Sequence, residues 1–342
     1  MKMLLGLSEA LPSLVGAKFS SAKATKSLIF SPTELAIIRT STGIPFQLRY
    51  CPSLAKKPQP KKEPPNPDHG GLPPKKFDPF DNPPADLHIA DIPQRPDPPP
   101  THLLVLNKFP IIPQHFILAT KANKPQTHAL EADDLAAAHA CLRAWTAADP
   151  QRRLFAFFNS GECSGASQPH RHLQFLPEES MRDGDGDGGG WTLLLDLILA
   201  QQGRGLSLPC AHFAVALPEE PSAEQLQSAY AKLYTAAVAA SVAAGVLPAS
   251  ATPAMEGELP LSYNLALTLS GMAIIPRRAE GCMLRRDDGT EVGFVALNGT
   301  VLGGTLMVKG QEEWEYLRGG EGRLDKVLAG IGVPWKGEGA SL

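Results

Sequence analysis

An alternating segment near the middle of the chain constrains the fold more than any other feature. It reads His170-Arg171-His172-Leu173-Gln174. In a β-strand, successive side chains point to opposite faces, so the two histidines and the glutamine share one face. A loop of small residues, 159–168, precedes the segment. Such a loop can offer N–H groups and hydroxyls to an anion, and an imidazole beside it can attack phosphorus.

The composition excludes several classes of protein. A length of 342 residues, 43% of them hydrophobic, fits one large α/β unit or two domains with a substantial core. The net charge of −3 gives no overall field that would recruit nucleic acid or an anionic membrane. The five cysteines are scattered without a C-x-x-C pair, which favours reduced thiols. No apolar run approaches the ~20 residues that a membrane span needs.

The first 30 residues allow two interpretations. They are rich in Ser, Ala and Lys, and Glu9 is their only acidic residue, as in a mitochondrial transit peptide. Arginine, which transit peptides favour, is absent before Arg39. We therefore expect an amphipathic first helix of the folded protein. The predicted location is cytoplasmic, with the nucleus also open, and mitochondrial import is not favoured.

Two low-complexity stretches suggest where the chain divides. Residues 56–100 are dominated by Pro, Lys and Asp, which predicts an extended or partly disordered excursion, mobile at about 60–75. An Asp/Gly run predicts a flexible loop over 181–190. Its D-x-D-x-D spacing is like a calcium loop, but Leu194 stands where the required glutamate belongs. We expect an N-terminal half over 1–180 and a C-terminal half over 191–330.

Hydrophobic periodicity predicts similar elements in both halves. Strands are expected at 103–106, 116–120, 154–158, 212–217, 264–268, 272–275, 293–297 and 306–308. Helices are expected at about 131–147, at 222–245 behind a capping box, and in a last short segment around Trp314 and Leu317. Short links favour antiparallel pairing. The predicted class is α+β, with two related halves on one sheet or two.

Three interpretations of His170 and His172 follow from the residues alone. They could be a satisfied histidine pair in the core. They could form half of a zinc site with Cys163, although no second spaced pair of ligands is evident. They could carry out phosphoryl or nucleotidyl transfer, because neutral imidazole is nucleophilic near pH 7. In that third case His172, in the middle of the polar row, would be the nucleophile, and His170 would orient it.

Gln174 bears on the choice between transfer and hydrolysis. A histidine at this position could move protons to the leaving group and then activate water. Glutamine does not titrate, so it can only hold a phosphate by hydrogen bonding. A site without a proton shuttle should use an acceptor that is already anionic, such as phosphate. The sequence therefore favours transfer over hydrolysis. No resident metal is expected.

The same residues resemble a known family. The central stretch 159–174 is similar to the active-site segment of the fungal diadenosine tetraphosphate phosphorylases, or ATP adenylyltransferases. These belong to the histidine-triad superfamily, on the branch of galactose-1-phosphate uridylyltransferase. Weaker similarities occur in the expected order at 46–58, 78–83, 106–110, 263–265, 275–277 and 297–309, so the resemblance covers about 45–320. It implies two histidine-triad-like halves, of which one keeps the catalytic motif.

The resemblance also implies a reaction and its residues. Diadenosine tetraphosphate and phosphate would give ADP and ATP through an adenylylated His172, with Gln174 holding phosphate. The nucleotide site would be lined by Asn159, Gly165, Ala166, Ser167 and Gln168. Further substrate contacts would be Lys57, Asn107, Lys108, Asn298, Gly299, Thr300, Thr305 and Lys309. A divalent cation, Mg²⁺ or Mn²⁺, is expected to come with the substrate; oligomeric state is not readable.

The chain departs from the family pattern at four positions. Pro169 stands where family members carry an acidic residue, and Ala166 replaces a serine and so removes a hydroxyl donor. Thr305 stands where a methionine is expected, and Gly271 where a larger side chain is usual. Two alternatives to the phosphorylase stay open. One is a sugar-1-phosphate or adenylylsulfate-type transferase on the same scaffold, and the other is a non-catalytic nucleotide-binding protein.

Overall fold

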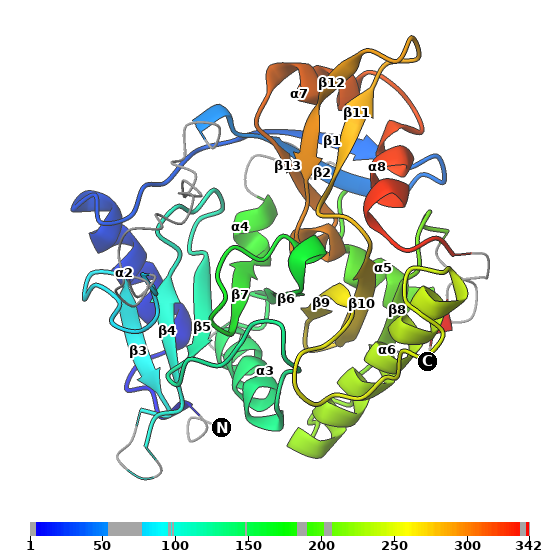
Figure 1. Cartoon of the computed structure of the whole chain (residues 1–342). Helices are drawn as coiled ribbons and strands as arrows, with labels where there is room; N and C mark the ends of the chain where they lie inside the picture. The colour runs from blue at the N-terminus through cyan, green and yellow to red at the C-terminus, as the bar shows by residue number, and fades with distance from the viewer. Residues whose placement is uncertain are drawn as a thin grey trace, which may run out of the picture.

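One large sheet, mostly antiparallel, organises the molecule (Figure 1). The computed structural model describes residues 5–53, 77–94, 97, 99–147, 149–182, 190–201, 207–335 and 340–341. The nine strands of the sheet lie in the order β14-β8-β10-β9-β6-β7-β5-β4-β3. Their bounds are β3 His88–Ile92, β4 His102–Leu106, β5 Phe116–Thr120, β6 Leu154–Ser160, β7 His172–Pro177, β8 Phe213–Ala216, β9 Ser262–Leu267, β10 Gly271–Arg277 and β14 Ala340–Ser341.

The sheet is continuous across the two halves of the chain. Strand β6 pairs antiparallel with β7 on one side and with β9 on the other, in a register that sets Asn159 opposite Asn264. Strands β3 to β7 therefore supply one part of the sheet and β8 to β10 the other. The predicted α+β class is confirmed, and the question of one sheet or two is answered by a shared main sheet.

Helices cover one face of this sheet. They are α2 (Leu11–Ala24), α3 (Ala132–Thr146) and α6 (Ala223–Ala243). The Ser222 side chain accepts from the Gln225 N–H, so the predicted capping box starts α6. Strand β6 shows how the faces divide, because Ala156 and Phe158 join the core under the helices, whereas Phe155 and Phe157 join the opposite core. The first helix is part of the folded protein, as the second interpretation of residues 1–30 predicted.

The opposite core combines segments from both ends of the chain. Strand β13 pairs in parallel with β2, which pairs antiparallel with β1. The bounds are β1 Glu34–Arg39, β2 Pro45–Tyr50, β11 Gly281–Arg285, β12 Glu291–Ala296, β13 Thr305–Val308, α4 Glu178–Arg182, α5 Leu194–Ala200, α7 Gln311–Arg318 and α8 Arg323–Ile331. Two 3₁₀ turns complete this side, η2 Glu162–Ser164 and η3 Gly299–Gly303. In Figure 1 the β1, β2 and β13 strands and the β11–β12 hairpin lie above the main sheet.

Three expectations about the chain need comment. The Pro-rich excursion contains a regular element, because β3 at His88–Ile92 pairs with β4 at the edge of the main sheet. The helix around Trp314 is not the last, since α8 follows it. Lys57, all of 60–75 and the Asp/Gly run at 183–189 lie outside the described residues. Among the helices that are described, none has both the length and the apolarity needed to cross a membrane.

Candidate active site

Strand β7 presents His172 and Gln174 to the face away from the helices. Leu173 and Phe175 point into the helix-covered core, where the Phe175 ring stacks on Phe116 with centroids 4.8 Å apart. Alternation then directs His172 and Gln174 to the other face. The segment begins as an isolated bridge of His170 with Pro125, and the regular strand starts at His172. The alternation expected for this segment therefore places His172 and Gln174 together on the face away from the helices.

The two central strands separate next to His172. The ladder between β6 and β7 extends only from Leu154–Pro177 to Phe157–Gln174. Beyond it, the buried Gln126 side chain joins the strands. Its Oε1 accepts from the His172 N–H at 2.8 Å, and its Nε2 donates to the Asn159 carbonyl at 2.7 Å and the His172 carbonyl at 3.2 Å. One amide therefore fixes the backbone of His172 on the side where β6 has separated, while Ala119 of β5 pairs with His172 on the other side.

This role of Gln126 leads to a first prediction. Gln126→Leu keeps the approximate volume but leaves three buried backbone groups without partners. We expect the free energy of unfolding to fall by about 2–3 kcal/mol, and the rate of reaction at His172 to fall at least about tenfold because the ring loses its fixed position. Urea unfolding and single-turnover kinetics measure the two effects. Gln151→Leu, at an exposed turn, is the control; equal effects in both variants would contradict the role.

His172 is oriented for nucleophilic attack through Nε2. Its Nδ1 donates to the His170 carbonyl at 2.8 Å, which fixes the tautomer with the lone pair on Nε2. Nε2 makes no hydrogen bond with any residue that the structure describes. The residue is only 3% exposed, and burial lowers the pKa of His172 to about 4. The ring is therefore neutral, and its Nε2 nucleophilic, at physiological pH.

The lowered pKa gives a second prediction. A neutral ring is the reactive form, so reactivity is present above a pKa of about 4 and is lost as the pH falls through it. Measured in a single turnover without phosphate, the rate of reaction at His172 should stay within about twofold from pH 8 to 5.5. A midpoint near 6.5, with the protein still folded by circular dichroism, would contradict a buried nucleophile.

His170 is held between two acceptors. Its Nδ1 lies 2.7 Å from Asp78 Oδ2, and its Nε2 lies 2.7 Å from the Thr120 carbonyl. The Thr120 hydroxyl also lies 3.1 Å from Nε2, so contacts at both ring nitrogens fix the His170 ring. The Phe80 ring packs on both histidines, 5.5 Å from His170 and 5.1 Å from His172 between centroids. His170 therefore braces the carbonyl that orients His172.

A chain of hydrogen bonds orients the Gln174 amide. The Phe109 N–H donates to Asn107 Oδ1, and Asn107 Nδ2 donates to His115 Nδ1 at 3.0 Å. That contact leaves the proton on His115 Nε2, which donates to Gln174 Oε1 at 3.0 Å. The Gln174 NH₂ group has no hydrogen-bond partner among the described residues. The amide is thereby set with its donors available to a ligand.

Two asparagine side chains are oriented in the same way as the Gln174 amide, with the oxygen engaged and the NH₂ group unused. Asn159 Oδ1 accepts from Asn264 Nδ2 at 2.9 Å and from the Gly299 N–H at 2.8 Å. Asn298 Oδ1 accepts from the Thr300 N–H at 3.0 Å and from its hydroxyl at 2.9 Å. Within the described structure neither NH₂ group has a partner. Three carboxamides thus keep their oxygens engaged internally and their N–H donors unused, an arrangement suited to phosphate oxygens.

The loop before the histidines is held against the C-terminal half. Gly165 has φ +76°, and a Cβ there would lie 2.6 Å from the Leu297 carbonyl oxygen, so only glycine fits. Asn264 Nδ2 also donates to the Ser164 carbonyl at 2.8 Å. Ala166 and Ser167 are exposed and Gln168 is half-buried. The structure therefore places the loop and Asn298–Thr300 together beside Asn159.

The remaining predicted contacts lie differently. Thr305 is fully buried, and its hydroxyl donates to Gln47 Oε1 at 3.1 Å, so it stabilises the β2–β13 junction instead of facing an open site. Lys108 and Lys309 are exposed at strand ends, and Lys108 Nζ lies 5.7 Å from the Phe109 ring centroid. Asn107 acts on His115. Lys57 lies outside the described residues.

Sequence reasoning missed several residues that build the site. Asp78 and Phe80 lie in the Pro-rich excursion, and Gln126 lies in a connection after β5. His115 had an available signal in the sequence, because it is a histidine directly before a buried strand. The described residues contain no group of three or more His, Cys, Asp or Glu side chains that could hold a metal ion.

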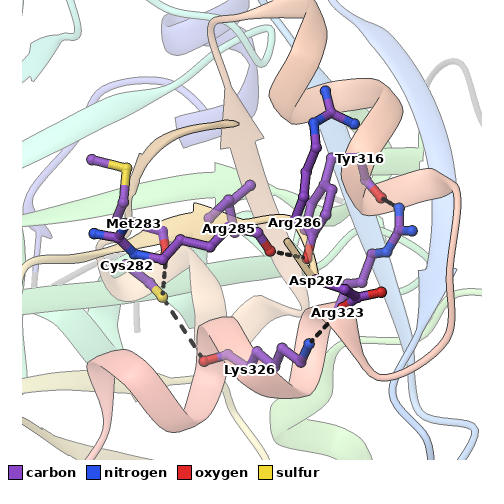
Figure 2. A pocket seen from close by; sticks show the side chains of 9 residues that line it. Cys282, Met283, Arg285, Arg286, Asp287, Tyr316, Arg323 and Lys326 are labelled. Carbon is purple, nitrogen blue, oxygen red and sulfur yellow. Dashed lines mark hydrogen bonds and ion pairs between the residues drawn. The ribbon is translucent and has the colours of Figure 1, made fainter. Parts of the chain in front are cut away.

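A basic pocket lies apart from these residues (Figure 2). It has a volume of about 330 Å³ and lies between the β11–β12 hairpin and α8, with Tyr316 and four cations in its lining: Arg285, Arg286, Arg323 and Lys326. Three of these cations already have carboxylates nearby: Arg285 lies 2.6 Å from Glu291, Arg286 3.4 Å from Glu312 and Lys326 3.9 Å from Asp287. Much of the pocket's positive charge is therefore neutralised within the chain.

Comparison with known proteins shows the family of the chain. The model of the Ap4A phosphorylase N-terminal domain matches residues 3–185, and that of the ATP adenylyltransferase C-terminal domain matches residues 206–334. Ap4A is diadenosine tetraphosphate. The chain belongs to the Ap4A phosphorylase family.

Relatives from Saccharomyces cerevisiae extend over nearly the whole chain. Protein APA1 is 28% identical over 325 residues, which are 94% of each chain. Diadenosine 5',5'''-P1,P4-tetraphosphate phosphorylase 2 is 28% identical over 336 residues, 96% of each chain. The crystal structure of yeast Ap4A phosphorylase Apa2 has a TM-score of 0.73 at 24% identity, covering 96% of this chain and 99% of that one. The last comparison confirms the fold.

Proposed function

We propose that this protein is a nucleotidyltransferase that phosphorolyses diadenosine tetraphosphate to ADP and ATP through an AMP–His172 intermediate. The observation that carries the proposal is the neutral, buried His172 ring, with its Nδ1 fixed by the His170 carbonyl and its Nε2 unused by the described residues. Three carboxamide NH₂ groups lie ready on the same side of the sheet. The relative named as a tetraphosphate phosphorylase, and the Apa2 structure in complex with Ap4A, support this substrate.

The first step forms a bond between His172 Nε2 and one α-phosphorus. The bond from that phosphorus to its bridging oxygen breaks, and ATP leaves with the electron pair. The substituted ring is a cation, and its Nδ1–H still donates to the His170 carbonyl. The Asp78 carboxylate, 2.7 Å from His170, adds a negative charge nearby. These contacts stabilise the charge that develops on the ring.

The second step regenerates the enzyme. An oxygen of inorganic phosphate attacks the same phosphorus, the Nε2–P bond breaks, and ADP leaves the neutral ring. The attacking oxygen is already anionic, so no base has to remove a proton. Gln174, held by His115, can bind that phosphate but cannot activate water. Phosphate should therefore be preferred over water as the acceptor.

The substrate carries about four negative charges on its bridge, and two groups of residues, together with a divalent cation, would hold it. The amides of Asn159, Asn298 and Gln174 would bind phosphate oxygens near the reacting atom. The exposed Lys108 and Lys309, with Lys57, would act on the outer phosphates as point charges. We propose that a divalent cation, Mg²⁺ or Mn²⁺, enters with the polyphosphate.

The proposal is tested by following nucleotide products with and without phosphate. Purified protein, diadenosine tetraphosphate and a divalent cation should give equal amounts of ADP and ATP only when phosphate is present. Without phosphate, at most one equivalent of ATP per enzyme should appear. Continuous turnover without phosphate would contradict phosphorolysis. A nucleotide sugar in place of the dinucleotide tests the alternative transferase, and it should be a much poorer substrate.

A further inference from the structure

A buried arginine contacts residues that hold the loop 159–168 against the C-terminal half. Arg277 ends β10 and is only 1% exposed. Its Nη1 donates to Asn264 Oδ1, and its Nη2 donates to the carbonyls of Ala279 at 3.0 Å, Glu280 at 2.9 Å and Leu297 at 3.0 Å. Nε has no partner. All of these acceptors are uncharged.

Arg277 differs from Arg171, another buried arginine, in the charge of its partners. Arg171 lies 2.8 Å from both Asp134 and Glu131, which neutralise it. Among the described residues, no carboxylate oxygen lies within 4 Å of the Arg277 guanidinium. Burial lowers the pKa of Arg277 to about 10, with Cys210, Cys163 and Glu280 acting in the opposite direction, so it still carries a full charge at neutral pH. A buried charge without a counter-ion is costly unless something compensates it.

Two sets of contacts connect Arg277 to the residues around the site. The first passes through Asn264, whose Oδ1 accepts from Arg277 and whose Nδ2 donates to Asn159 Oδ1 at 2.9 Å. The second passes through the Leu297 carbonyl, against which Gly165 packs. Hydrogen bonds in a chain polarise one another, so a cation at one end makes the far amide a stronger donor.

We propose that Arg277 is a positioning residue whose buried charge, with no carboxylate in direct contact, is transmitted through Asn264 and strengthens the Asn159 amide as a donor to the phosphate of the bound nucleotide. The inference rests on the proposed function, because it assumes that a nucleotide phosphate occupies the space beside Asn159. The anionic ligand then supplies a counter-charge for Arg277, which no carboxylate of the described residues contacts directly and on which Glu280 acts only from farther away. The effect should strengthen binding of the phosphate group and leave binding of the nucleoside part of the ligand unchanged.

The test compares AMP with adenosine by isothermal titration calorimetry. Arg277→Met keeps the length of the side chain and removes its charge, and it should weaken AMP binding about tenfold or more, with adenosine binding changed less than about twofold. Arg277→Lys should restore most of the AMP affinity because the charge returns. Arg278→Met is the matched control: Arg278 is the next residue, is exposed, and donates to carbonyls of α8. It should leave both affinities unchanged.

A second variant covers the case in which Arg277→Met does not fold. Asn264→Ser leaves Arg277 in place but shortens the link to Asn159, and it should show the same selective loss for AMP. Equal losses for AMP and adenosine, or failure of Arg277→Lys to recover AMP binding, would overturn the inference. These outcomes leave the proposed function standing as long as wild-type protein forms AMP–His172. A wild-type protein that binds no AMP would instead refute the proposed function.

Discussion

His172→Ala is expected to abolish phosphorolysis, with turnover falling by a factor of about 10⁴ or more, because covalent catalysis through Nε2 is lost. The variant should still bind AMP within about threefold of wild type. The ring contributes little to the hydrogen bonds that hold the phosphate, since those come from the three amides. Turnover assays and calorimetry on the same preparation measure the two quantities.

The control for this variant is a histidine outside the site. His139 is buried on α3, in the core on the other side of the sheet. Replacing it with glutamine should leave turnover unchanged, although stability can shift. Activity of His172→Ala within about tenfold of wild type would show that another group attacks phosphorus. Loss of AMP binding together with activity would show that the ring mainly supports the pocket.

Gln174→Glu is expected to reduce turnover by about 10²–10³. The change is isosteric, and one carboxylate oxygen can still accept from His115 Nε2. The other oxygen replaces the NH₂ donor and repels the incoming phosphate. Because this loss concerns the acceptor, the second step should suffer more than the first.

Separate kinetics of the two steps check this expectation. Formation of ATP in the first turnover reports attack by His172, and the phosphate-dependent release of ADP reports the second step. Gln151→Glu adds the same negative charge at an exposed turn and should behave as wild type. If Gln174→Glu slows the first step and leaves the phosphate step unchanged, the glutamine does not hold the acceptor.

The sequence predicted the catalytic strand because its information is local. The spacing of His170, His172 and Gln174 fixes which side chains share a face, whatever surrounds the strand. The helices at 132–146 and 223–243 were predictable for the same reason, from apolar spacing and a capping box. The pairing of β6 with β9, which joins the halves into one sheet, has no local signal.

The supporting residues were not predictable because they come from distant parts of the chain. Asp78 lies 92 residues before the His170 ring that it holds, inside a segment whose proline content suggested disorder. Gln126 acts only because β6 and β7 separate, which is a property of the folded sheet. For Thr305 the resemblance implies a substrate contact, and the structure shows its hydroxyl donating to Gln47, a residue distant in the sequence.

Intact-protein mass spectrometry after brief exposure to diadenosine tetraphosphate without phosphate tests the central claim most directly. The protein should gain the mass of one AMP, and peptide mapping under non-acidic conditions should place it on His172. Adding phosphate before the quench should remove the AMP and release one equivalent of ADP. Phosphorolysis that proceeds with no such adduct, or with AMP attached to another residue, would contradict the account.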